Sequence, residues 1–209
     1  VKEGGGPDPD NNGKLRDCIA KAKANNVPND NIQRIIKKAS ADDKNSYESI
    51  VYEGYGPSGV AVMVETLTDS RNRTAANLRH YFDKYGASLG ANGCVSYLFT
   101  KKGVLIVEAE GLNEETVMED CVGAEDFDMG EDYMQITTDP DQLHDVREAL
   151  EAKGYVFVSA EAQYIPSTTA TLSAADDLKK MGLLLDSLDE DEDVQNFWHN
   201  MENEEDLDR

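Results

Sequence analysis

The chain has 209 residues, 39% of them hydrophobic, and a net charge of −22 at pH 7. Its apolar content can fill the cores of one to three domains, whereas its longest apolar runs are far shorter than the ~18 residues of a membrane span. Three widely spaced cysteines without a Cys-x-x-Cys motif exclude a disulfide framework and a zinc knuckle. We therefore expect a cytoplasmic protein that has no membrane partner.

The charge is unevenly distributed along the chain. Residues 1–40 hold eight Lys or Arg and five Asp or Glu, residues 41–100 hold five and seven, and residues 101–209 hold seven and thirty. This asymmetry is typical of a nucleic-acid-facing segment beside an acidic body. An acidic surface that only keeps the protein in solution explains the same numbers, and charge alone does not decide between the two.

Residues 14–40 are predicted to form two short helices. Apolar residues recur at i, i+3, i+4 and i+7 in both segments, at Leu15, Cys18, Ile19 and Ala22 and again at Ile32, Ile35, Ile36 and Ala39. Each helix should bury this stripe and present cations on its other faces. The cations concerned, which are our candidate nucleic-acid-binding residues here, are Lys14, Arg16, Lys21, Lys23, Arg34, Lys37 and Lys38.

From Tyr47 onward, the spacing of apolar residues indicates strands interspersed with helices. Strands are predicted at 48–53, 60–67 and 93–99, with a helix at 72–85. Residues 101–166 follow the order βαββαβ of a ferredoxin-like unit, and a helix at 173–188 and a strand at 194–200 close the sheet begun by residues 47–99. The fold class is therefore α+β. We expect an N-terminal helical domain (1–46), an α/β domain (47–100 plus 167–201), a ferredoxin-like domain inserted in it (101–166) and an acidic tail (202–209).

The sequence contains no convincing catalytic or metal-binding constellation. Gly54-x-Gly56-x-x-Gly59 copies a dinucleotide fingerprint, but a strand follows it where the fingerprint needs a helix, so a hairpin turn is the better interpretation. Its three histidines are far apart, and acidic strings such as Asp189-x-Asp191-x-Asp193 lack the glycine and the final glutamate of a calcium loop. We expect no catalytic residue, no metal, no cofactor and no small-molecule substrate.

The segment Thr68-Asp-Ser-Arg-Asn-Arg-Thr74 is more informative. It brings Arg71 and Arg73 to the turn before a predicted helix, where backbone amides and guanidinium groups favour phosphate oxygens. Ordinary helix capping, with both arginines paired to nearby acids, is the alternative. We include both arginines among the candidate nucleic-acid-binding residues and keep the alternative open.

Four motifs occur in order along the chain: Asn25-Asn-Val-Pro-Asn-Asp-Asn-Ile32, Tyr52-Glu-Gly-Tyr-Gly-Pro57, Thr68-Asp-Ser-Arg-Asn-Arg-Thr74, and Asp193-Val-Gln195 with Asn200. Together they resemble the YebC/PmpR family, which includes mitochondrial translational activators of cytochrome oxidase. The resemblance implies a helical domain followed by two ferredoxin-like α/β domains, one inserted in the other. It marks two motif turns, made of Tyr52, Gly54, Tyr55, Gly56 and Pro57, and of Thr68, Asp69, Asn72 and Thr74.

The resemblance also implies a function in gene expression. We expect first a non-enzymatic DNA-binding transcriptional regulator. The alternatives are a ribosome-associated factor that binds ribosomal RNA and relieves stalls at proline-rich stretches, with ribosomal proteins as further partners, and a protein-interaction module with an acidic docking surface. The family carries a basic segment ahead of the position of Val1, so we expect the helical domain to be incomplete at its start. Ser70 stands where the family has Asn, a change that should keep the turn.

The two motif turns are predicted to lie apart. They flank opposite ends of an antiparallel strand pair, and eight residues at ~3.3 Å each separate them by ~25 Å. Tyr55 and Arg73 should therefore contact a macromolecule at two points and should not line one closed cavity. On this interpretation, replacing Arg71 and Arg73 by Ala weakens binding with little effect on stability.

Overall fold

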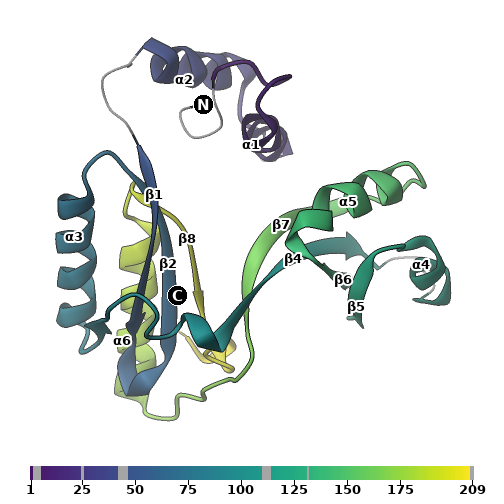
Figure 1. The fold of residues 1–209 in the computed structure, drawn as a ribbon. Helices are drawn as coiled ribbons and strands as arrows, with labels where there is room; N and C mark the ends of the chain where they lie inside the picture. Colours follow the sequence, from purple (N-terminus) through teal and green to yellow (C-terminus); the bar gives the residue numbers. More distant parts are fainter. Residues whose placement is uncertain (2–5, 25, 42–46, 110–113, 131, 208–209) are drawn as a thin grey trace.

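The structure is a computed structural model, and it describes residues 1, 6–24, 26–41, 47–109, 114–130 and 132–207 (Figure 1). Its helices are α1 (Gly13–Ala24), α2 (Asn29–Ala41), α3 (Arg71–Lys84), α4 (Glu114–Asp120), α5 (Leu143–Glu151) and α6 (Ala175–Asp189). Its strands are β1 (Glu48–Tyr55), β2 (Ala61–Thr68), β3 (Ser88–Leu89), β4 (Phe99–Glu108), β5 (Ala124–Met129), β6 (Tyr133–Thr138), β7 (Phe157–Pro166) and β8 (Val194–His199). The predicted α+β class is confirmed.

Helices α1 and α2 form a pair at the end of the molecule where β1 begins (Figure 1). Asn12 caps α1, since its Oδ1 accepts a hydrogen bond of 3.0 Å from the Leu15 amide. Leu15 and Ile32 are buried, but Cys18 is exposed and Ile35 is 61% exposed. The predicted apolar stripes are therefore too wide, because a helix that packs against one short neighbour buries only a narrow seam.

The first sheet has the strand order β3-β1-β2-β8, and each neighbouring pair is antiparallel. Helices α3 and α6 cover one of its faces (Figure 1). The core between them is apolar and includes Val60, Val62, Val64, Leu78, Phe82, Met181, Leu184, Leu185 and Leu188. Strands β1 and β2 pair from Tyr55 with Ala61 to Glu48 with Thr68, so the two motif turns lie at opposite ends of the hairpin.

The second sheet has the order β5-β6-β4-β7, again antiparallel throughout. With α4 after β4 and α5 after β6, this is the βαββαβ unit predicted for residues 101–166. Its core is formed by Leu105, Val107, Val117, Cys121, Met134, Ile136, Val146 and Leu150. Strand β4 begins at Phe99 and β7 ends at Pro166, close to the predicted limits of the insertion, and the division into domains stays a prediction.

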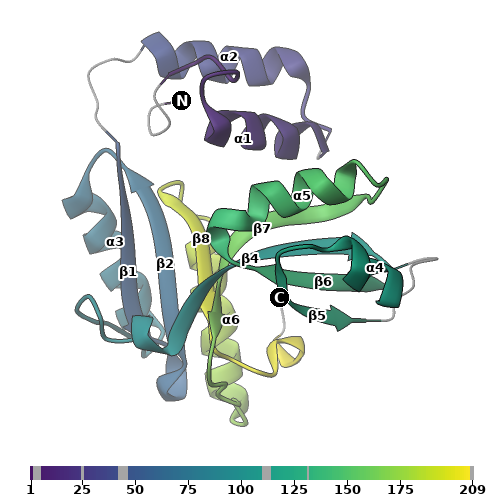
Figure 2. The ribbon, with the colours of Figure 1, turned by 45° about the vertical axis from the view of Figure 1, so that its right-hand side comes forward.

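The two sheets meet through a small apolar cluster. Ala61 and Met63, on the face of the first sheet opposite α3 and α6, pack with Val95, Phe99 and partly buried neighbours. Across this junction the rings of Tyr164 and Trp198 make an edge-on contact with centroids 4.9 Å apart. Helix α1 lies near β7, as Figure 2 shows, and the exposed Lys21 forms an ion pair of 2.8 Å with Glu161 there.

Two predicted details are wrong. Residues 93–99 do not form a strand: Gly93 has a φ of +87°, Ser96–Leu98 form a 3-10 turn, and only Phe99 belongs to β4. Strand β1 contains Tyr52 as predicted but continues beyond residue 53 to Tyr55, and the turn itself starts later, with a 3-10 turn at Pro57–Gly59. No described helix combines the length and the apolar character that crossing a bilayer requires.

Candidate nucleic-acid interface

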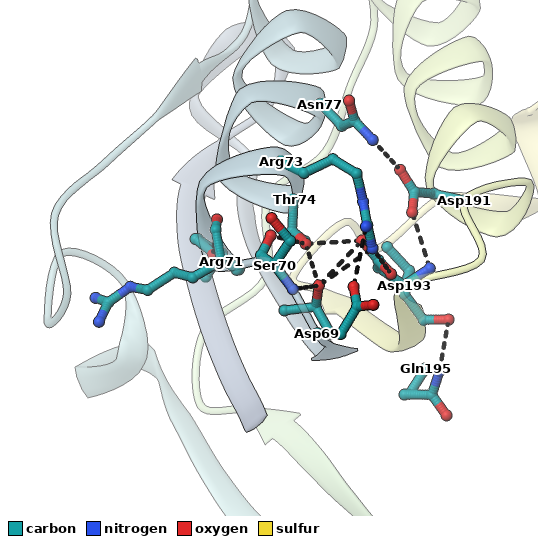
Figure 3. A network of polar contacts seen from close by, with 12 residues as sticks. Asp69, Ser70, Arg71, Arg73, Thr74, Asn77, Asp191, Asp193 and Gln195 are labelled. Carbon is teal, nitrogen blue, oxygen red and sulfur yellow. Dashed lines mark hydrogen bonds and ion pairs between the residues drawn. The ribbon is translucent and has the colours of Figure 1, made fainter. Parts of the chain in front are cut away.

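The Asp193 carboxylate holds the Thr68–Thr74 turn (Figure 3). Asp193 is only 8% exposed, and its Oδ2 accepts a hydrogen bond of 2.7 Å from the Thr74 hydroxyl and lies 3.3 Å from the Thr68 hydroxyl. Thr68 in turn accepts the Ser70 amide at 2.9 Å. Burial opposes ionisation of Asp193, but the hydrogen bonds from Thr74 and Arg73 outweigh it and lower the pKa of the carboxyl. The turn is therefore built around a buried negative charge.

Arg73 and Arg71 differ in their surroundings. The Arg73 guanidinium contacts Asp193 at 2.8 Å and Asp69 at 2.9 Å, and these bonds raise its pKa. The Arg71 side chain extends away from this network (Figure 3), and its backbone oxygen accepts the Tyr52 hydroxyl at 3.3 Å. Burial raises the pKa of Tyr52, and the charge of Arg71 counteracts part of this effect. The predicted alternative of arginines paired to nearby acids thus describes Arg73, while Arg71 is the guanidinium presented outward.

A cavity of about 530 Å³ opens beside Arg73, between the turn, α3 and the segment before β8. Four acidic side chains besides Asp193 line it: Asp69, Glu190, Asp191 and Glu192. Asp191 accepts the Tyr81 hydroxyl at 2.9 Å, and burial together with this bond raises the pKa of Tyr81 to about 12. The excess of carboxylates over the single Arg73 makes this cavity unfavourable for phosphate.

The helical pair presents most of the predicted cations to solvent. Arg34, Lys37 and Lys38 are exposed on α2, and Arg34 donates to the Asn31 side chain at 3.3 Å. On α1, Lys23 is exposed and Arg16 is exposed with one hydrogen bond of 3.4 Å to the Pro9 oxygen. Lys21 is engaged with Glu161, and the side chain of Lys14 lies outside the described residues.

At the other end of the hairpin, side chains of β1 form hydrogen bonds with the segment that follows β3. The buried Glu53 carboxylate accepts the amides of Gly93, Val95 and Ser96 at 2.7, 2.9 and 2.8 Å. Burial opposes its ionisation, but these three bonds lower the pKa of Glu53. The Tyr55 hydroxyl adds a bond of 2.8 Å to the Cys94 oxygen. Glu53 was missed from the sequence, where a glutamate in a strand looks like a solvent-facing residue.

The motif residues at this end serve packing. A Cβ at Gly54 would lie 2.6 Å from Phe82 and 2.7 Å from the Ser88 oxygen, so only glycine fits there. Gly56 and Pro57 are buried at the start of the turn. Tyr55 does not line the cavity beside Arg73, so the two motif ends do not share it.

Comparison with known proteins identifies the family. Residues 47–201 match the family model described as the second and third domain of TACO1/YebC, and residues 1–42 match that of the TACO1/YebC N-terminal domain. The chain belongs to the TACO1/YebC family. This confirms the resemblance inferred from the four sequence strings.

Relatives in this family are similar over nearly the whole chain. A "probable transcriptional regulatory protein" of Ruminiclostridium cellulolyticum is 54% identical, over 96% of this chain and 83% of its own length. Proteins with the same description in Acetivibrio thermocellus and Clostridioides difficile are 52% and 53% identical, over 96% and 95% of this chain and 84% of their own lengths. The crystal structure of a conserved hypothetical protein from Aquifex aeolicus is 43% identical, covers 95% of this chain and 83% of its own, and superposes with a TM-score of 0.82.

Proposed function

We propose that this protein is a non-enzymatic regulator of gene expression that binds DNA through the exposed cations of its helical pair and through Arg71. The names of its relatives support regulation of transcription. The observation that carries the binding proposal is the segregation of charge. Arg34, Lys37 and Lys38 stand exposed together on α2, in a chain whose net charge is −22.

The helical pair differs in net charge from the acidic body. The first forty residues carry three more positive than negative charges, whereas residues 101–209 carry twenty-three more negative than positive ones. At physiological salt the Debye length is ~8 Å, so phosphates bound at α2 interact mainly with nearby cations and little with distant acids. The outward position of Arg71 adds a cation beyond the helical pair.

Ribosomal RNA is a second candidate ligand. Cations on α2 and at Arg71 come from separate elements, which suits contacts with phosphates along an extended backbone. Recognition of this kind reads shape more than sequence and is common for structured RNA. In a sucrose gradient of cell lysate, co-migration with ribosomal particles supports this candidate, and a free pool enriched on promoter fragments supports DNA.

The test is a charge reversal on α2. In the variant R34E/K37E/K38E, each lost phosphate contact should reduce the slope of log affinity against log salt by about one unit, for duplex DNA or a ribosomal RNA fragment. The control R79E/K84E/K179E changes the net charge equally on α3 and α6. Equal affinities and salt slopes for the α2 variant and the parent, at several salt concentrations, would contradict the proposal.

A further inference from the structure

The segment between β3 and β4 presents one aromatic side chain to solvent. Tyr97 is 72% exposed, whereas its neighbours Val95 and Phe99 are 0% and 8% exposed in the junction between the sheets. Tyr97 belongs to the 3-10 turn Ser96–Leu98 that leads into β4. Tyr97 belongs to none of the three apolar clusters among the described residues, so packing does not account for its presence.

The backbone that carries Tyr97 is held in place from both sides. Glu53 accepts the amides of Val95 and Ser96, the two residues immediately before Tyr97. The buried Val95 side chain anchors the same stretch in the apolar junction. Hydrogen bonds to an ionised carboxylate are among the stronger ones in proteins, so this segment is far more constrained than an ordinary surface loop.

Tyr55, which lies close to Tyr97, has its hydroxyl bound inside the protein. Interaction with Tyr97 is the main cause that raises the pKa of Tyr55, and Tyr55 itself donates to the Cys94 oxygen at 2.8 Å. An exposed ring on a constrained backbone loses little conformational entropy when a flat group stacks on it. Four residues later, the exposed Lys101 provides a cation on β4.

We infer that Tyr97 is a stacking platform for an unpaired nucleobase, and that it forms a second contact point at the opposite end of the β1–β2 hairpin from Arg71. This inference rests on the proposed function, because it is nucleic acid that supplies the flat partner. Bases within a duplex are already stacked on each other, whereas an unpaired base offers its whole face to an aromatic ring. The contact point is Tyr97 and not Tyr55, whose hydroxyl is used inside the protein.

The experiment compares Tyr97→Ala with Tyr97→Phe and with Tyr133→Ala, which removes a 52% exposed tyrosine from β6. Fluorescence anisotropy measures binding to three probes: an RNA hairpin with an unpaired loop, a single-stranded DNA of the same sequence, and a blunt duplex DNA. Tyr97→Ala should lose about 5- to 150-fold in affinity for the first two probes, the range of one base stack, and little for the duplex. Tyr97→Phe and Tyr133→Ala should bind like the parent.

The probes separate the possible outcomes. Replacing one loop base by 2-aminopurine should give a quenched signal on binding the parent and Tyr97→Phe, and no quenching with Tyr97→Ala. If Tyr97→Ala binds all three probes as tightly as the parent while R34E/K37E/K38E binds them more weakly, the stacking inference alone is overturned. An equal loss of affinity for the duplex and for the single-stranded probes would also overturn it. Failure of the parent to bind any probe would overturn both this inference and the proposed function.

Discussion

Removal of the Asp193 carboxylate should destabilise the protein strongly, whereas removal of the Arg71 side chain should not. In Asp193→Ala, the buried Thr74 hydroxyl loses a bond of 2.7 Å and Arg73 loses bonds of 2.8 and 2.9 Å. A hydrogen bond to a buried charge contributes about 1.5–3 kcal/mol, and the Arg73 pair adds less because its guanidinium is half exposed to solvent. We expect a total loss of about 2–4 kcal/mol.

The assay is equilibrium unfolding in urea, followed by circular dichroism and by the fluorescence of Trp198, which lies on β8, five residues after Asp193. Thr74→Val and the double variant complete a cycle, whose coupling energy should be about 1 kcal/mol because both residues share one bond. Arg71→Ala should unfold like the parent while binding nucleic acid more weakly. An Asp193→Ala variant as stable as the parent would refute the assignment of Asp193 as the residue that holds the turn.

Two further predictions concern packing and pH. Gly54→Ala should cost about 1–3 kcal/mol of stability, because its Cβ would meet Phe82 at 2.6 Å, while Gly13→Ala, with nothing within 4 Å, should be neutral in the same urea titration. The lowered pKa values of Glu53 and Asp193 mean that their stabilisation is complete above the ordinary carboxyl pKa of ~4 and is lost as the pH falls through their folded values. The melting temperature should therefore drop below about pH 4, and less steeply in Glu53→Gln; an unchanged acid profile in that variant would contradict this cause.

Many of the helices and strands could be predicted from the sequence, because burying one face of an element imposes a regular spacing of apolar residues. The βαββαβ order of residues 101–166 follows from alternating strands and two helical stripes, and the structure contains it as the sheet β5-β6-β4-β7. The helix expected at 173–188 lies at Ala175–Asp189. In these segments the apolar side chains on one face fill a large core, so local preference and tertiary packing agree.

The candidate site was predicted less well, because it depends on contacts between distant residues. The apolar Val95 and Phe99 suggested a strand at 93–99, but Glu53, some forty residues earlier, binds three amides there and holds a turn. Arg71 and Arg73 look equivalent in sequence, but Asp193, in the segment before β8, and Asp69 both pair with Arg73. Spacing within one segment contains no information about such partners.

The most direct test of the nucleic-acid interface is lysine footprinting. The protein is acetylated with a limiting amount of an N-hydroxysuccinimide ester, alone and when saturated with duplex DNA or a ribosomal RNA fragment, and each lysine is quantified by mass spectrometry. Lys23, Lys37 and Lys38 should be protected by the bound nucleic acid, while Lys179 on α6 should react equally in both samples. Protection of Lys179 with continued reaction of Lys37 and Lys38 would contradict binding through the helical pair.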